Sequence, residues 1–298
     1  MSKWKLIEEK LTQARFYEKK DGKALCKLCP HFCSIGEGEI GLCRVRKNIG
    51  GALYAESYAR FTSLAMDPVE KKPFRRFHPG RHILSAGSYG CNMRCAFCQN
   101  SDISQKTPDR ELSAEHIPPE AMLKLAMSVN GNLGVAFTYN EPLISVEYLL
   151  DAAQLLKENG LAVALVTNGL ANPGPLKELL PFVDAMNIDV KGFTPEFYKK
   201  LGGDLETVKE TVRLAAAKCH VEATTLVIPG GNDSDDETEA MCRWLASVSP
   251  EIPLHLSRFT PRYRMTDRMP TPPETLRRME GIAKRWLRHV YLGNVGNT

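Results

Sequence analysis

Three cysteines stand close together in the stretch GSYGCNMRCAFCQN, residues 87–100. They are Cys91, Cys95 and Cys98, and their spacing is C-x3-C-x2-C. Three thiols are an odd number for disulfide pairing and one ligand short of a closed tetrahedral metal site. A cubane iron–sulfur cluster normally takes four cysteines, so three leave one iron open to another ligand. The spacing therefore favours a [4Fe-4S] cluster with one open iron over a structural zinc site.

A second set of four cysteines lies upstream, with the spacing C-x2-C-x3-C-x9-C. Its members are Cys26, Cys29, Cys33 and Cys43. Four thiolates can close a tetrahedral zinc site or hold a second cubane cluster, and free thiols are a third alternative. Because a closed centre has no position for a further ligand, we expect this quartet to bind a separate, mainly structural metal centre. The remaining Cys219 and Cys242 are far apart and are expected to be small buried side chains.

The overall composition shows no strong charge bias. The 298 residues are 43% hydrophobic, and 39 basic against 35 acidic residues give a net charge of +4. This excess does not indicate a nucleic-acid or membrane partner. Aromatic residues interleaved with cations over 70–82 are able to stack nucleic-acid bases, but the stretch is predicted to be a solvated connector with some residues packed on the core. Residues 1–20 are predicted to form a charged amphipathic helix without the apolar core of a signal peptide. We expect a cytoplasmic protein, in which clustered thiols stay reduced and bind metal.

Short apolar runs and amphipathic helical stretches alternate from about residue 83 onward. Strands are predicted at 83–87, 134–139, 162–168, 185–191, 221–228, 254–259 and 289–295. Buried strands joined by helices form a parallel sheet with right-handed crossovers, and periodicity alone does not separate a doubly wound sheet from a barrel. We expect two domains, a helix with a four-cysteine metal-binding segment over 1–79 and an α/β core over 80–298.

Polar residues lie on or just after the carboxyl-terminal parts of several of these strands. They are Thr138, Asn140 and Glu141, then Thr167 and Asn168, then Asp189 and Lys191, and finally His255 and Arg258. In parallel α/β sheets the ligand lies at the carboxyl ends of the strands. Any one such residue is typical of a turn. Together with three cysteines after the first strand, the set indicates a binding site at one edge of the sheet.

The cysteine pattern, with Phe97 directly before Cys98, resembles the C-x3-C-x-aromatic-C signature of the radical S-adenosylmethionine (radical SAM) superfamily, and the likeness extends over nearly all of 83–295. It implies a partial (β/α)6 TIM-like barrel, open at one side, with the cluster at the carboxyl edge of its strands. It also implies that the open iron binds the amino and carboxylate groups of S-adenosylmethionine. An electron from the cluster then cleaves this cofactor to methionine and a 5′-deoxyadenosyl radical.

The resemblance also implies which residues hold the cofactor. TYNEP stands where the family usually has a Gly-Gly-Glu stretch, so Glu141 is the expected partner of the methionine ammonium, with both glycines replaced. The segments VTNG, NIDVKGF and HVYLGNV resemble those that contact the ribose, the carboxylate and the adenine. The predicted cofactor-binding residues are Phe97, Asn140, Glu141, Thr167, Asn168, Asp189, Lys191, His255 and Arg258.

Within the superfamily, the segments CKLCPHFCSIGEGEIGLCRVRKN, EKKPFRRFHPG and LHLSRFTPRY resemble the radical enzymes of AmmeMemoRadiSam systems, which are related to pyruvate formate-lyase activating enzymes. This implies a reductant such as flavodoxin or ferredoxin. It implies as substrate either a glycine Cα on a glycyl radical enzyme or a small molecule handled with AMMECR- and Memo-like partners. The rival class is a non-catalytic iron–sulfur electron carrier, which has no need of Glu, Asn and Asp residues beside its cluster.

Overall fold

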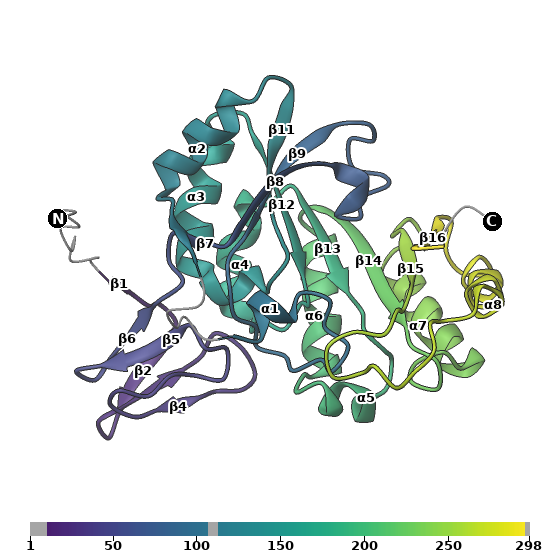
Figure 1. The fold of residues 1–298 in the computed structure, drawn as a ribbon, viewed down its shortest axis with the longest axis horizontal. Coiled ribbons are helices and arrows are strands. Elements are labelled where there is room, and N and C mark those ends of the chain that lie inside the picture. The colour runs from purple at the N-terminus through teal and green to yellow at the C-terminus, as the bar shows by residue number, and fades with distance from the viewer. Residues whose placement is uncertain (1–10, 107–112, 296–298) are drawn as a thin grey trace.

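A mostly parallel, eight-stranded sheet forms the core of the chain in the computed structural model, which describes residues 11–106 and 113–295 (Figure 1). Its order is β16-β15-β14-β13-β12-β11-β9-β8, and only the β8–β9 pair is antiparallel. The bounds are β8 Ser63–Pro68, β9 His82–Gly87, β11 Asn132–Phe137, β12 Ala162–Thr167, β13 Ala185–Asp189, β14 His220–Val227, β15 Leu254–Arg258 and β16 Val290–Gly293. The described strands leave β8 and β16 as two unpaired edges. The predicted α/β fold with an open parallel sheet is confirmed.

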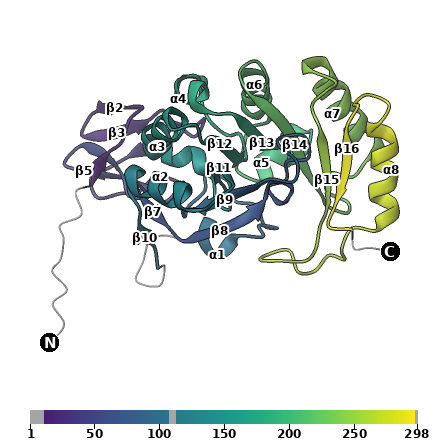
Figure 2. The same cartoon turned by 90° about the horizontal axis from the view of Figure 1, so that it is seen from above.

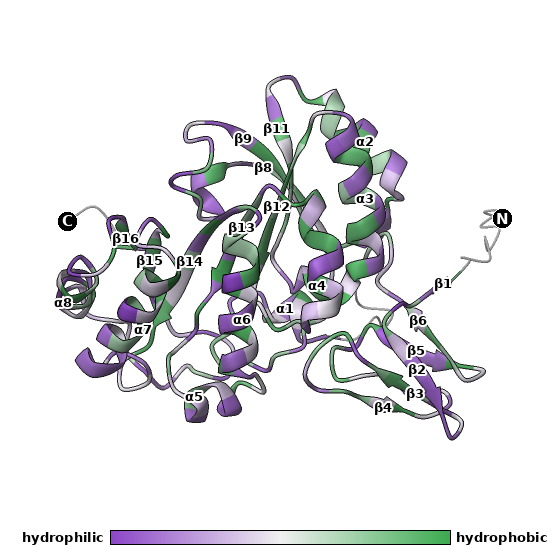
Figure 3. Cartoon of the chain, turned by 180° about the vertical axis from the view of Figure 1, so that it is seen from behind, coloured by the Kyte–Doolittle hydropathy of each residue, from purple (hydrophilic) through white to green (hydrophobic). Residues whose placement is uncertain are grey.

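Six helices follow the first six parallel strands. They are α2 (Pro119–Ser128), α3 (Val146–Glu158), α4 (Pro173–Leu179), α6 (Leu205–Ala216), α7 (Asp235–Val248) and α8 (Pro273–Ala283). Figure 2 shows that the sheet curves and that these helices lie along its outer side. Their outward faces are hydrophilic, whereas the strands are largely hydrophobic (Figure 3). A single outer layer of helices is the arrangement of a partial barrel, since a doubly wound sheet carries helices on both faces.

Alternate residues of the central strands pack into two different cores. Val135, Val163 and Met186 belong to the large core that includes the helices. The residues next to these in the chain belong to a smaller core on the other face of the sheet; they are Ala136, Ala164 and Ala185. Side chains in a strand alternate between the two faces, which explains this division. That smaller core is filled by Phe74 and Phe77 of the connector, both buried. The connector therefore packs its two phenylalanines on the inner face of the sheet while Arg75 and Arg76 stay exposed, as expected of a solvated connector with some packed residues.

The N-terminal segment consists of two three-stranded sheets, ordered β1-β6-β5 and β2-β3-β4. The strands are β1 Thr12–Gln13, β2 Tyr17–Lys20, β3 Lys23–Cys26, β4 Ser34–Ile35, β5 Arg46–Ile49 and β6 Ala52–Ala55. The helix predicted for residues 1–20 is therefore wrong at 12–13 and 17–20, while 1–10 lie outside the described residues. The reason is the Asp21–Gly22 turn, in which both residues have positive φ (50° and 72°) and Lys20 pairs with Lys23. An Asp-Gly pair in this conformation is a strong hairpin signal.

The predicted domain boundary at 79/80 stays a prediction, but the core sheet begins earlier in the chain. Strand β8 lies within the predicted N-terminal domain and pairs with β9 along its whole length. Of the helices in residues 11–106 and 113–295, none has both the length and the apolar character needed to cross a membrane.

Candidate active site

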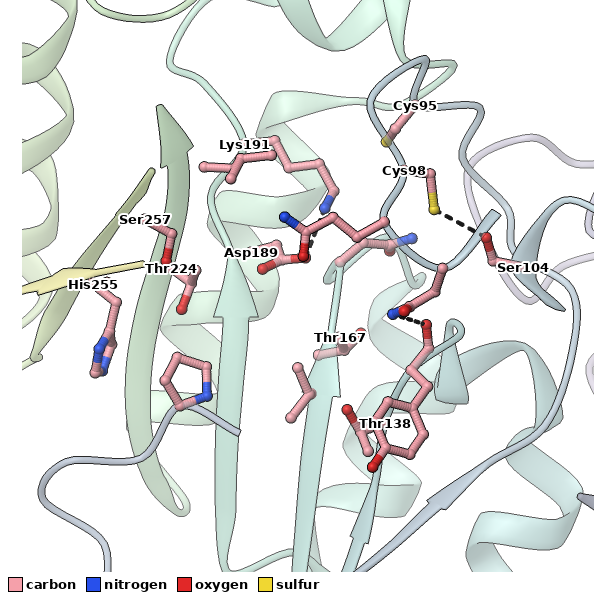
Figure 4. A pocket seen from close by; sticks show the side chains of 18 of the residues that line it. Cys95, Cys98, Ser104, Thr138, Thr167, Asp189, Lys191, Thr224, His255 and Ser257 are labelled. Atoms are coloured by element: carbon pink, nitrogen blue, oxygen red, sulfur yellow. Dashed lines mark hydrogen bonds and ion pairs between the residues drawn. The ribbon is translucent and has the colours of Figure 1, made fainter. Parts of the chain in front are cut away.

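A cavity of about 520 Å³ lies at the carboxyl ends of the parallel strands (Figure 4). The structure brings nearly every predicted site residue to its wall. These are Cys91, Cys95, Phe97, Cys98, Asn140, Glu141, Thr167, Asn168, Asp189, Lys191 and His255. Arg258 is the exception among the described residues, because its Nε donates to the Thr271 carbonyl at 2.8 Å. The placement of Arg258 in the site is therefore wrong.

The three cysteines lie in the loop between β9 and the short helix α1 (Ser101–Ser104). Gly90 leads into this loop with φ of 80°, and a Cβ there would lie 2.6 Å from the Cys43 carbonyl. Only glycine allows so close an approach to the N-terminal segment. Within the loop, the Met93 amide donates to Cys91 Sγ at 3.3 Å, and Cys98 Sγ lies 3.1 Å from Ser104 Oγ.

Burial makes Cys91 and Cys95 weaker acids than free cysteine. It raises the pKa of Cys91 well above its usual value and that of Cys95 to about 11, although the positive charge of Lys191 lowers both. Metal coordination deprotonates such thiols outright. Among the described residues, no three His, Cys, Asp or Glu side chains converge closely enough to hold a single metal ion. A cubane cluster does not need this convergence, because each thiolate binds a different iron. Three thiols around one cavity therefore fit a cubane cluster.

Glu141 is buried at the junction of β11 and β12. Its Oε1 accepts from Thr167 Oγ1 at 2.6 Å and from the Leu143 amide at 2.9 Å, and its Oε2 accepts from the Asn168 amide at 2.7 Å. Burial raises the pKa of Glu141 to about 7, and these three hydrogen bonds limit the rise. The carboxylate is thus rigidly placed at the cavity wall, with an environment that favours a cationic ligand.

Tyr139 and Asn140 replace the two glycines expected before Glu141. The backbone at Tyr139 keeps a conformation that glycine adopts easily. Tyr139 has φ of 73°, a left-handed conformation that costs about 1 kcal/mol or more for such a residue. Its hydroxyl donates to Asp67 Oδ2 at 2.9 Å, and Lys72 Nζ lies 4.7 Å from its ring centroid. Asn140 accepts from the Ser88 amide at 3.0 Å and donates to the Tyr89 carbonyl at 2.9 Å. Asn140 therefore holds the chain that leads into the cysteine loop.

The ends of β12 and β13 connect the cysteines with charged groups. Asn168 Nδ2 donates to Asn92 Oδ1 at 2.9 Å and lies 3.5 Å from Cys91 Sγ. Lys191 Nζ pairs with Asp189 Oδ2 at 2.6 Å, on the side of the cavity that faces the cysteines (Figure 4). Burial is the largest single influence and would lower the pKa of Lys191, but Asp189, Cys95 and Tyr198 together outweigh it and raise the pKa. The site thus holds a fixed cation and two carboxylates beside the thiols.

At the far end of the cavity, His255 is held by a residue that the sequence interpretation missed. Glu222 is fully buried on β14 and lies 2.5 Å from His255 Nε2. It also accepts from His220 Nε2 and from the amides of Arg75 and Arg76, at 2.7 to 2.9 Å. Burial raises the pKa of Glu222, but these hydrogen bonds outweigh it and lower the pKa to about 2. An acidic residue inside an apolar strand was the available signal, because buried carboxylates need partners.

Known proteins are similar to this chain in sequence, and solved structures are similar to it in fold. A family model described as the radical SAM superfamily matches residues 86–245. The uncharacterized protein MJ0808 of Methanocaldococcus jannaschii is 43% identical over 290 residues, 96% of this chain and 86% of that protein. The pyruvate formate-lyase 1-activating enzyme of Escherichia coli K12 is 24% identical over 213 residues, 66% of this chain and 86% of that enzyme.

Among solved structures, methylornithine synthase (PylB) has a similar fold, with a TM-score of 0.50 at 16% identity over 70% of this chain and 65% of that one. The family model covers more than half of the chain and includes the cysteine loop, Glu141, Asn168 and the Asp189–Lys191 pair. The chain therefore belongs to the radical SAM superfamily of enzymes.

Proposed function

We propose that this enzyme binds a [4Fe-4S] cluster through Cys91, Cys95 and Cys98 and cleaves S-adenosylmethionine reductively. The observation that carries the proposal is that these three thiols share one cavity with Glu141, Asn168, Asp189 and Lys191. Within the described lining, these are the only cysteines, so one iron of a cubane is left for the cofactor. The cavity volume of about 520 Å³ is within the range of ligand sites.

The charges of the wall residues support a defined orientation of the cofactor. Glu141 is the proposed partner of the methionine ammonium, because its carboxylate is held in a fixed position at the cavity wall. Lys191, paired with Asp189 at 2.6 Å, supplies a cation and a carboxylate for the ribose hydroxyls or the cofactor carboxylate. Such prearranged groups would orient the cofactor and exclude water, while the cluster would supply the electron transfer that cleaves it.

The proposed reaction needs one electron from outside the chain, supplied by a small redox protein such as flavodoxin or ferredoxin. A cluster held by Cys91, Cys95 and Cys98 would use that electron for reductive cleavage of the bond between the sulfonium and C5′, which would give methionine and a 5′-deoxyadenosyl radical. The radical takes a hydrogen atom from the substrate, so 5′-deoxyadenosine and a substrate radical result. The buried walls of the cavity protect this step from solvent.

For the substrate we propose a hydrogen donor that approaches from the open side of the sheet. The similarity to a pyruvate formate-lyase 1-activating enzyme supports a glycine Cα on a partner protein. The sequence likeness to AmmeMemoRadiSam enzymes supports a small molecule handled with AMMECR- and Memo-like partners. Incubation of the loaded enzyme with each candidate, followed by detection of a substrate radical, separates the two.

Anaerobic reconstitution with iron and sulfide, followed by dithionite and S-adenosylmethionine, tests the function itself. We expect release of 5′-deoxyadenosine and methionine in equal amounts, which chromatography with mass detection measures. A matched reaction without dithionite should release neither. A reducible cluster that never cleaves the cofactor would instead support the rival class, a non-catalytic iron–sulfur electron carrier.

A further inference from the structure

The four N-terminal cysteines surround a second, much smaller cavity of about 10 Å³. Cys26 ends β3, Cys33 immediately precedes β4, and Cys29 lies in the turn between these strands. Cys43 comes from the loop before β5. The other walls are apolar and include Leu28, Ile35 and Ile144. The topology thus brings together four thiols that are spread over 18 positions of the sequence.

A buried cation lies on the wall of the same cavity. Arg46, the first residue of β5, is 1% exposed. Its Nη2 donates to Glu147 Oε1 at 2.7 Å and to the Arg15 carbonyl at 2.5 Å. Its Nε and Nη1 have no acceptor among the described residues. Guanidinium donors that are buried without acceptors are costly, so this edge of Arg46 points to an anionic group in the cavity.

The small size of the cavity favours a single ion. About 10 Å³ accommodates roughly one water-sized particle, whereas a cubane of four irons and four sulfides is far larger. A single divalent ion with four thiolates carries a net charge of −2, which Arg46 would stabilise. Tetrahedral coordination by four sulfurs is typical of zinc. The described cysteines do not yet converge on one point, so their side chains must rotate inward to bind an ion.

We propose that Cys26, Cys29, Cys33 and Cys43 bind one zinc ion, with Arg46 as the counter-cation. This centre also braces the radical SAM loop. His31, two residues after Cys29, donates from its Nε2 to the Asn92 carbonyl at 2.7 Å. Asn92 follows Cys91 directly. Loss of the ion therefore loosens the loop that carries the first cluster ligand.

Metal analysis of the full-length variant Cys91→Ala, Cys95→Ala, Cys98→Ala tests the site independently of the proposed function. We expect about one zinc per chain, together with a tetrahedral thiolate spectrum after replacement by cobalt. Further change of Cys29 and Cys43 to serine should remove the zinc, and change of Cys219 to alanine should not. About four irons per chain with a cluster spectrum, or no bound metal, would overturn the proposal.

Arg46 is tested by competition with a zinc chelator. The double variant Arg46→Met, Glu147→Leu removes both members of the buried ion pair, so neither charge is left alone. We expect zinc affinity to fall about 10- to 100-fold, the usual effect of losing an outer-shell partner. Arg46→Lys keeps the charge and should lose less than about 10-fold, and it remains informative where the double variant fails to fold. Unchanged affinity in a folded double variant would overturn the role of Arg46.

Discussion

Changing Cys91, Cys95 or Cys98 singly to alanine is expected to reduce 5′-deoxyadenosine release to the background. Three thiolates are the minimum that anchors a cubane and still leaves one iron open, so no spare ligand replaces a lost one. The three sulfurs line the same cavity, and the described lining contains no fourth cysteine. Iron content and the cluster absorption should fall together with activity, which anaerobic reconstitution measures in one set of samples.

The matched control is Cys219→Ala. Cys219 is half-buried after α6, and its sulfur donates to the Ala215 carbonyl at 3.5 Å, away from the cavity. We expect this variant to keep its cluster and its activity and to lose only a little packing. Loss of the cluster in Cys219→Ala, or a full cluster in Cys95→Ala, would mean that the ligands have been misassigned.

Changing Glu141 to glutamine is expected to weaken productive binding of S-adenosylmethionine by about 100-fold or more. The carboxylate is buried, and breaking a buried charge pair costs about 3–5 kcal/mol, with each 1.4 kcal/mol worth tenfold. Glutamine also presents an amide N–H₂ to donors that now face carboxylate oxygens, namely Thr167 Oγ1 and the amides of Leu143 and Asn168. The loss should appear mainly in the KM for S-adenosylmethionine.

Glu141→Asp separates charge from geometry in this experiment. Aspartate keeps the negative charge but is one methylene shorter, so we expect about a tenfold loss. The iron content and circular dichroism of both variants should match those of the unmodified enzyme, which separates a binding defect from misfolding. A KM that stays the same in Glu141→Gln would show that the carboxylate does not contact the cofactor.

The sheet and the cysteine ligands could be predicted because their signals are local. Strands such as Ala162–Thr167 and Ala185–Asp189 are buried on both faces, so their apolar runs mark them within two residues. Asn168 directly follows the first of these strands and Lys191 lies two residues after the second, and parallel strands place such residues at one edge. The spacing of the three cysteines in the loop needs no tertiary information at all.

Other features depend on pairing between distant segments. Glu222 and His255 are separated by 33 positions, and Arg75 and Arg76 join them from the connector. The alternation of side chains along a strand explains why Arg258 does not line the cavity. His255 and Ser257 share the face that lines the cavity, so Arg258 lies on the opposite face. Charge periodicity suggested a helix near the N-terminus, but the Asp21–Gly22 turn outweighs that pattern.

We propose that the three cysteines of the loop leave one iron of the cluster without a protein ligand, so that S-adenosylmethionine can bind this iron. Electron–nuclear double resonance on the reduced enzyme, with the cofactor labelled by ¹⁵N in its amino group or ¹⁷O in its carboxylate, tests this directly. We predict magnetic coupling between the cluster electron and both labels, and only a weak through-space contribution when the label is in the cofactor's methyl hydrogens. A cluster spectrum that is unchanged by the cofactor, without coupling to either the amino nitrogen or the carboxylate oxygen, would contradict the account.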